Sequence, residues 1–257
     1  MAKIYPVDDE VTWPDSEGVL GIVGVAPWAT LDFLQIFYGL LQTSKDWHFP
    51  RVICDINTKI PSRGRHLELG ERDPSPFILQ SIHDLAAQGA TIAVVPCNTA
   101  HILYSQWAPQ ATIPVVSIID ATVNEIRKNG ARKVAVFSSG AVANYNVYNN
   151  KLHEHGFLIE HLTDKQQQIV SQAITEMKIN GFIQPQTISA IHIILNELKN
   201  FEVDSVIIGC TELKSLVGPC AEYFPTVAES NSAMAKQVLS LMNLPESIFS
   251  TKCLDLL

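Results

Sequence analysis

Two segments of this chain repeat one order of residues, and this repeat constrains the fold more than any other feature. VVPCNTAH (94–101) and VIIGCTE (206–212) each end an apolar run in a cysteine, which a threonine follows within two positions. Short apolar runs that alternate with amphipathic helices are typical of parallel strands in an α/β fold. We therefore expect two similar αβ halves with parallel-dominated sheets, related by pseudo-twofold symmetry, and an active site in the cleft between them.

The same alternation predicts where the strands and helices of each half lie. Strands are predicted at residues 18–26, 50–56, 91–96 and 113–118, and again at 131–140, 204–209 and 224–230. Helices are predicted from Thr30 onward, at 76–89, 143–155, 165–179 and 186–199, and in a last segment through Leu241. Residues 1–118 should form the N-terminal αβ half and 119–228 the C-terminal half, with 229–257 packing back on the first.

The composition is that of an ordinary globular enzyme and argues against several classes of function. With 18 Lys and Arg against 26 Asp and Glu, the net charge is −8, whereas a nucleic-acid partner would favour a basic patch. No apolar run reaches the roughly 20 residues that span a bilayer, and the acidic start lacks the apolar core of a secretory signal. We expect a cytoplasmic protein with no nucleic-acid and no membrane partner.

The cysteines form no recognisable disulfide or zinc pattern. They are Cys54, Cys97, Cys210, Cys220 and Cys253, an odd number without a CxxC pair. Cys97 and His101, four positions apart, could supply half of a metal site, but no second pair completes it. We therefore expect no metal and no cofactor. Burial of Cys97 and Cys210 as small core residues is the structural alternative.

Cys97 and Cys210 are the candidates for chemistry because each follows the carboxyl end of a predicted parallel strand. Asn98 or Thr99 is expected to cap a helix over 102–107, and Thr211 a helix over 213–217. A helix N-terminus would hold a carboxylate and lower the pKa of a thiol from about 8.5 toward neutrality. Two such thiols on facing halves predict a pair that acts on opposite faces of one bound molecule.

Such a pair suits stereochemical inversion at an acidic carbon atom. One thiolate removes the proton from one face while the opposite thiol supplies a proton to the other. An amino-acid α-proton is far less acidic than a thiol, and each unit of pKa mismatch costs about 1.4 kcal/mol. The site must therefore also stabilise the carbanionic carboxylate, with preorganised N–H donors and a nearby arginine or lysine.

The motifs resemble those of one known family. PCNTAH and GCTE resemble the paired signatures of cofactor-independent aspartate/glutamate racemases, and NTKIPSR (57–63) resembles the N-x-x-I-P-x-R segment of the aspartate racemase branch. The similarity runs from about Val19 to Met242. It implies an isomerase, a PLP-independent aspartate racemase that interconverts L- and D-aspartate by two-base proton transfer at Cα.

The resemblance also implies a role for each site residue. Cys97 and Cys210 would be the acid/base pair, with Cys210 acting on the L-enantiomer and Cys97 on the D-enantiomer. Arg63, assisted by Lys178, would bind the side-chain carboxylate of the substrate; otherwise Arg63 is a surface charge and Lys178 a helix-end charge. The other substrate-binding residues would be Thr30, Asn57, Asn98, Thr99, Ser138, Thr211 and Glu212, and the residue that polarises the site would be His101.

The chain departs from the family pattern at several positions, which leaves other functions open. The loop GVAPWAT (24–30) is one residue shorter than the family's first loop, and SSGA (138–141) lacks a hydroxyl at Ala141. The alternatives are a glutamate or broad Asp/Glu racemase, a hydantoin racemase, or a relative that decarboxylates or isomerises diacids. A two-lobed dicarboxylate-binding protein without turnover would have the same composition. By analogy with the family we expect a homodimer.

Overall fold

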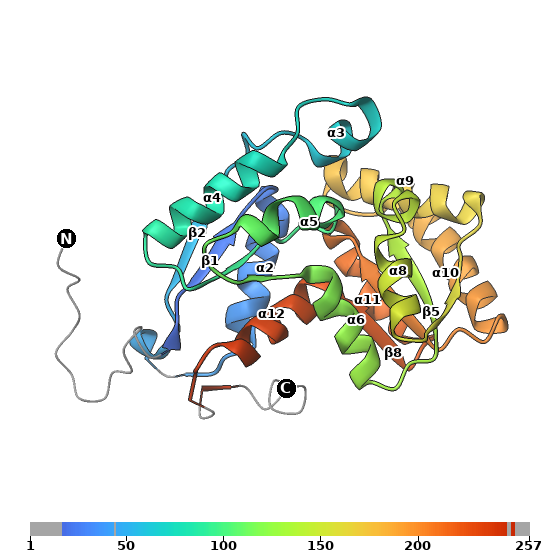
Figure 1. The fold of residues 1–257 in the computed structure, drawn as a ribbon. Helices are drawn as coiled ribbons and strands as arrows, with labels where there is room; N and C mark the ends of the chain where they lie inside the picture. Colours follow the sequence, from blue (N-terminus) through green and yellow to red (C-terminus); the bar gives the residue numbers. More distant parts are fainter. Residues whose placement is uncertain (1–16, 44, 246–247, 250–257) are drawn as a thin grey trace.

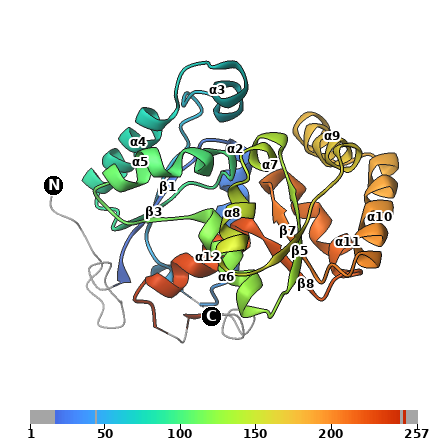
Figure 2. The same ribbon diagram turned by 45° about the vertical axis from the view of Figure 1, so that its right-hand side comes forward.

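The computed structural model describes residues 17–43, 45–245 and 248–249, and they form two αβ halves (Figure 1). Each half contains a four-stranded parallel sheet, with strand order β2-β1-β3-β4 in the first and β6-β5-β7-β8 in the second. Because the two orders are equivalent, the predicted pair of similar halves is confirmed. Helices lie on both sides of the sheets (Figure 2).

The first half alternates between strands and helices around the buried strand β1. Its regular elements are β1 (Leu20–Val23), α2 (Pro27–Gly39), β2 (Val52–Asp55), α3 (Arg63–Leu69), α4 (Ser75–Ala87), β3 (Ile92–Val94), α5 (Tyr104–Trp107) and β4 (Val115–Val116). Its 3₁₀ turns are η1 (Asp46–His48), η2 (Thr99–Leu103) and η3 (Ala108–Gln110). Since β1 pairs with both β2 and β3, the carboxyl ends of these three strands meet at one edge of the sheet.

The second half repeats this arrangement with β5 and β7 at its centre. Its elements are α6 (Ile118–Lys128), β5 (Lys133–Ser138), α7 (Gly140–Asn144), α8 (Val147–Glu154), β6 (Leu158–Glu160), α9 (Asp164–Asn180), α10 (Pro185–Asn200), β7 (Ser205–Gly209), η4 (Thr211–Leu216), α11 (Val217–Ala221) and β8 (Thr226–Glu229). The helix α12 (Ser230–Leu241) follows β8. No helix in the described part of the chain is long and apolar enough to cross a lipid bilayer.

Several predicted boundaries of the first half differ from the structure, and two of them have a clear local reason. The helix predicted from Thr30 begins at Pro27, because proline suits the first turn of a helix, where its missing N–H is not needed. The strand predicted over 113–118 keeps only β4, because the Ser117 side chain already caps α6.

Two further differences lie in the second half. The helix predicted over 143–155 is broken between α7 and α8 at Asn146, whose φ of 52° is left-handed and interrupts the helical path. β6 was not predicted from the sequence. Its three residues, LIE, are exposed or half-buried, and the apolar run from Phe157 to Ile159 is too short to mark a strand by itself.

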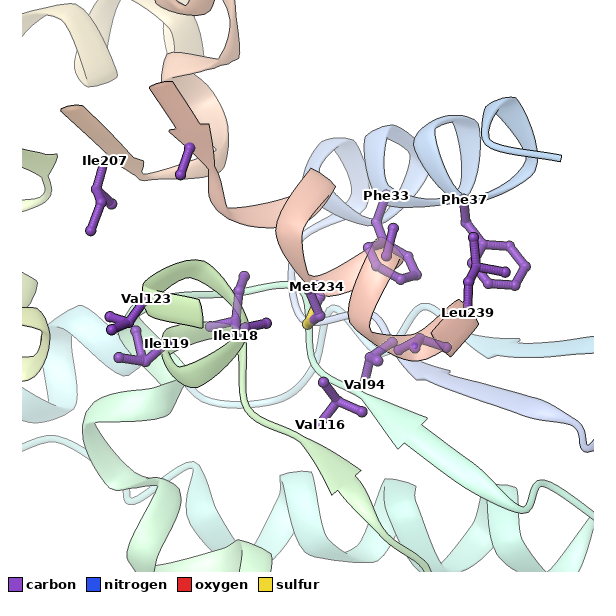
Figure 3. Close-up of a cluster of buried hydrophobic side chains, with 14 of the residues drawn as sticks. Phe33, Phe37, Val94, Val116, Ile118, Ile119, Val123, Ile207, Met234 and Leu239 are labelled. Carbon is purple, nitrogen blue, oxygen red and sulfur yellow. The ribbon is translucent and has the colours of Figure 1, made fainter. Parts of the chain in front are cut away.

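One apolar core joins the two halves. α12 packs against α2 of the first half and against α6. Phe33 and Phe37 of α2 and Met234 of α12 are fully buried in this core (Figure 3). The same cluster contains Val94 of β3 and Ile207 of β7, one from each sheet. The strands that carry the two cysteines are therefore fixed to a common core.

Candidate active site

Eight of the predicted site residues line one pocket, the cysteine pocket, to which both halves contribute. It has a volume of about 300 Å³ and lies beyond the carboxyl ends of β3 and β7. This volume is at the small end of the range for ligand pockets and suits a molecule the size of an amino acid. The predicted residues that line it are Arg63, Cys97, Asn98, Thr99, Lys178, Cys210, Thr211 and Glu212.

The two cysteines occupy equivalent positions after β3 and β7. Cys97 lies in a tight turn, in which its N–H donates to the Val95 carbonyl oxygen at 2.7 Å, and η2 begins two residues later. Cys210 is the extended residue directly before η4. Because β3 and β7 hold the same place in their sheets, residues far apart in the sequence reach one pocket.

The predicted side-chain caps after the cysteines are wrong. Neither η2 nor η4 has a side-chain cap. The Thr211 hydroxyl donates to the Glu212 carboxylate at 3.1 Å, and the Asn98 amide nitrogen donates to the Ser230 hydroxyl at 2.9 Å. The backbone N–H groups of Asn98, Thr99 and Thr211 have no acceptor among the described residues, so they remain free to bind an anion.

The Cys210 thiol is buried and donates to the Glu212 carboxylate, with the sulfur 3.1 Å from Oε2. Burial and then the charge of Glu212 raise the pKa of Cys210 well above its usual value. The predicted lowering of this pKa is therefore wrong for Cys210. A short 3₁₀ turn contributes little dipole, and loss of hydration outweighs it. At neutral pH Cys210 is a thiol and can act as an acid.

Glu212 is the centre of a small polar network. Its carboxylate accepts from Cys210 and Thr211, and Lys178 Nζ lies 3.5 Å from Oε1. Burial raises the pKa of Glu212, but Lys178 and these hydrogen bonds outweigh burial and hold the pKa below its usual value. Lys178 thus pairs with Glu212, and through it influences Cys210.

Arg63 ties two loops together, and one nitrogen of its guanidinium has no acceptor in the described part of the chain. Its terminal nitrogens donate to the Val25 and Pro61 carbonyl oxygens at 3.1 Å and to the Ile60 carbonyl oxygen at 3.4 Å. Its Nε is buried and has no acceptor within the described part of the chain. Nε and Nη2 form the edge that binds a carboxylate with two parallel hydrogen bonds. Nη2 already donates one hydrogen to Val25 and has a second hydrogen to offer.

Three predicted substrate contacts lie outside the pocket and hold loops instead. The Thr30 hydroxyl donates to the Ala26 carbonyl oxygen at 2.8 Å, within the first turn of α2. Asn57 accepts from Lys59 N at 3.1 Å and closes the turn after β2. The Ser138 hydroxyl makes a 3.4 Å contact with the next carbonyl oxygen.

His101 also lies outside the pocket, and both of its ring nitrogens are occupied. Nδ1 lies 2.9 Å from the Cys97 carbonyl oxygen, and Nε2 accepts from Ile118 N at 3.2 Å. Burial lowers the pKa of His101 to about 4, so the ring is neutral and holds the turn that carries Cys97. It is not free to complete a metal site with Cys97, and the described residues contain no cluster of three or more potential metal ligands.

Several pocket residues were not anticipated. Ala26 and Ala29 of the α2 turn, Ser139 and Gly140 at the start of α7, and Glu68 of α3 all line the pocket. The SSG turn after β5 is a sequence signal for Ser139, because it occupies the same place in the second half as the first loop does in the first. Glu68 carries no such signal, since a lone glutamate in a polar helix is typical of a solvated surface.

Contacts beneath the pocket fix the two cysteine loops relative to each other. The Tyr148 hydroxyl donates to Asn98 Oδ1 at 2.6 Å, which joins the loop after β3 to α8 of the other half. Lys214 of η4 forms an ion pair with Asp32 of α2. These bonds span the halves on either side of the pocket and hold it in shape.

The sequence profile that describes Asp/Glu/Hydantoin racemases matches residues 22–238. The chain belongs to this racemase family. The match covers both sheets and both cysteine loops, so the family assignment rests on nearly the whole described fold.

The chain is similar in sequence to a broad specificity racemase and in fold to solved racemase structures. The broad specificity amino-acid racemase RacX of Bacillus subtilis is 25% identical over 230 residues, which cover 86% of this chain and 97% of the relative. The structure of Picrophilus torridus aspartate racemase superposes with a TM-score of 0.77 at 24% identity, covering 89% of this chain and 96% of that one. An aspartate racemase homologue from Pyrococcus horikoshii gives a TM-score of 0.73 at 21% identity over 87% and 98% of the two chains.

Proposed function

We propose that this racemase interconverts L- and D-aspartate without a cofactor, with Cys97 and Cys210 as its two bases. The observation that carries the proposal is the single pocket that both cysteines line from equivalent strand ends. A pair of thiols on opposite walls can address both faces of one Cα. The broad specificity of the Bacillus subtilis relative favours a second candidate, turnover of both aspartate and glutamate.

The proposed reaction moves one proton in and one proton out. For the D-enantiomer, the Cys97 thiolate removes the Cα proton, and the Cys210 thiol donates its own proton to the opposite face. The products are L-aspartate, a Cys97 thiol and a Cys210 thiolate, so charge and protons balance. The reverse direction starts from a Cys97 thiol and a Cys210 thiolate. Proton exchange with water interconverts this form of the enzyme and the form with a Cys97 thiolate and a Cys210 thiol.

The substrate carboxylates have separate partners in this proposal. The α-carboxylate accepts from the free N–H groups of Asn98, Thr99 and Thr211, which would stabilise the carbanionic intermediate. The side-chain carboxylate binds the guanidinium of Arg63, whose Nε has no acceptor among the described residues. Glutamate is one methylene longer, a difference typically worth about 1 to 3 kcal/mol to a pocket.

Isotope exchange in D₂O tests the proposal. The protein should incorporate deuterium at Cα from both enantiomers of aspartate, whereas a dicarboxylate-binding protein would incorporate it from neither. Cys97→Ala and Cys210→Ala should each abolish racemisation. Each variant should keep slow exchange with one enantiomer, because the remaining thiol can still remove and return a proton on its own face: Cys97→Ala with L-aspartate, and Cys210→Ala with D-aspartate. Full racemisation by either variant would remove that cysteine from the mechanism.

The expected setting of the enzyme is also part of the proposal. We expect a homodimer in the cytoplasm that acts on a free amino acid. Light scattering at several protein concentrations should give about twice the mass of the 28.4 kDa chain.

A further inference from the structure

Glu68 is the one carboxylate in the cysteine pocket that has no partner among the described residues. It lies in the last turn of α3, and its exposed side chain lines the pocket. The other carboxylate of the pocket, Glu212, is already bonded to Cys210, Thr211 and Lys178. A negative charge that faces a ligand pocket without a counter-ion is open to a cation from the ligand.

The other oxygen atoms around the pocket are largely occupied. The Ala26 carbonyl oxygen accepts from the Thr30 hydroxyl at 2.8 Å and from the Thr30 N–H at 3.1 Å. The Ser139 hydroxyl oxygen accepts from Val142 N at 3.4 Å as the cap of α7. Glu68 therefore offers the strongest open acceptor in the pocket.

An amino acid brings one group that the proposed site has not yet accounted for. On the proposed function, the two carboxylates of aspartate bind the N–H groups after the cysteines and the guanidinium of Arg63. The α-ammonium group still needs an acceptor, because leaving a charged donor unpaired on entry into a pocket is costly. We propose that Glu68 binds the α-ammonium group of the substrate and thereby selects amino acids over the corresponding diacids.

The position of Glu68 fits this role, because the end of α3 reaches across the cleft. The Tyr145 hydroxyl of the second half donates to the Leu67 carbonyl oxygen at 3.4 Å, and Gly70 ends α3 with a left-handed φ of 66°. Arg63 begins the same helix. One short helix thus presents a cation and an anion to the pocket, which matches an amino acid that carries a carboxylate and an ammonium group.

The test compares ligands that differ only in the ammonium group. Isothermal titration measures binding of racemic aspartate against succinate, and of racemic glutamate against glutarate; racemic mixtures are used so that turnover does not change their composition. In Glu68→Gln, affinity for both amino acids should fall about tenfold or more, while affinity for both diacids stays within about twofold. Glu71→Gln is the matched control, since Glu71 follows the same helix, pairs with Arg65 and does not line the pocket.

The possible results separate this inference from the proposed function. Equal loss of affinity for amino acids and diacids in Glu68→Gln, no loss at all, or tighter binding of both would overturn the role of Glu68. Retained diacid binding also shows that the variant is folded. A wild-type protein that binds aspartate through Glu68 but shows no deuterium exchange would refute the racemase proposal alone. A protein that racemises aspartate with full amino-acid affinity in Glu68→Gln would refute this inference alone.

Discussion

The two sulfur atoms of the site have unequal surroundings, although the fold that presents them is symmetric. Cys210 is buried and its thiol donates to a carboxylate. Cys97 is half-buried, and its backbone carbonyl oxygen lies at hydrogen-bond distance from the His101 ring. Burial and Glu212 keep Cys210 protonated, so the resting protein holds an acid on that wall. With the enantiomer assignment proposed above, this resting form is prepared for the D-enantiomer.

The protonation of Cys210 should respond in opposite directions to its two charged neighbours. Glu212→Gln removes a negative charge and leaves a weaker, neutral hydrogen-bond acceptor, so the pKa of Cys210 should fall. Lys178→Met removes a positive charge that favours the thiolate, so the pKa should rise further. The measurement is alkylation of Cys210 by iodoacetamide as a function of pH, followed by mass spectrometry of its peptide.

Exposed Glu222 offers the control for this pair of variants, because Glu222→Gln removes a charge at a distance from the sulfur. Its alkylation profile should superimpose on that of the wild-type protein. Movement of the Glu212→Gln and Lys178→Met profiles in the same direction would contradict an electrostatic origin.

His101 should make the stability of the protein depend on pH. Burial lowers its pKa to about 4 in the folded protein, against about 6.5 in an unfolded chain. As the pH falls below 6.5, the unfolded chain binds a proton at His101 before the folded protein does, and this favours unfolding. The contribution of His101 to the free energy of unfolding is therefore constant above pH 6.5 and decreases until about pH 4. The expected loss is about 3 kcal/mol in the free energy of unfolding.

Urea denaturation between pH 7 and 4 measures this loss in the wild-type protein and in His101→Gln. The variant should be less stable at pH 7, and the difference between the two proteins should shrink as the pH falls. Glu229, whose pKa burial raises to about 7, contributes to both curves and cancels in the difference. A difference that stays constant with pH would mean that His101 titrates normally.

The chemistry of single residues was predictable only where a sequence pattern carried it. The cysteines and their neighbours were found because the motif occurs twice, and both copies reach one pocket. The pKa of Cys210 was mispredicted, because burial depends on packing from distant segments. Glu68 was missed because nothing in its local sequence distinguishes a pocket residue from a solvated one.

At the scale of elements, the glycine before Cys210 is required by a neighbouring helix. A Cβ atom at Gly209 would lie 2.7 Å from Cε2 of Tyr148, a buried ring of α8 whose hydroxyl bonds to Asn98. The end of β7 can therefore approach α8 only without a side chain, and this approach sets the position of Cys210.

Gly209→Ala should destabilise the protein by about 1 to 3 kcal/mol, because a fully buried ring cannot easily move aside. It should also reduce racemisation, because the Cys210 loop shifts. Gly218→Ala is the matched control: a Cβ atom there meets nothing within 4 Å, and the residue lies in α11. Thermal unfolding should show Gly218→Ala unchanged or slightly stabilised. Equal melting temperatures for the two variants would argue against the clash with Tyr148.

The order of elements was largely predictable, while their ends were not. Alternating apolar runs and helical periodicity predicted every strand of both sheets except β6. A buried parallel strand such as β7 needs an apolar run, whereas the largely exposed β6 does not. The break at Asn146 was missed, since asparagine is compatible with a helix and its left-handed backbone is settled by the packing of α8. The similarity of the two halves was predictable from the two cysteine motifs, which repeat one order of residues in each half.

At the scale of the whole molecule, the shared core makes the two halves one cooperative unit. Residues of both sheets and of α2, α6 and α12 belong to a single buried cluster. The halves have separate sheets, yet the apolar faces of α2, α6 and α12 are buried only when both halves are folded. The cysteine pocket therefore depends on the stability of both halves.

A substitution in the outer layer of the second half should consequently unfold the first half as well. All four tryptophans lie within residues 1–118, so tryptophan fluorescence reports on the first half, whereas circular dichroism also detects α9 and α10 of the second. Ile194→Ala empties a buried position of α10 and should cost about 2 to 5 kcal/mol. Both signals should shift to lower urea by the same amount and stay superimposed. A fluorescence transition that keeps its wild-type midpoint would mean that the halves unfold independently, and that the core between them does not couple the walls of the site.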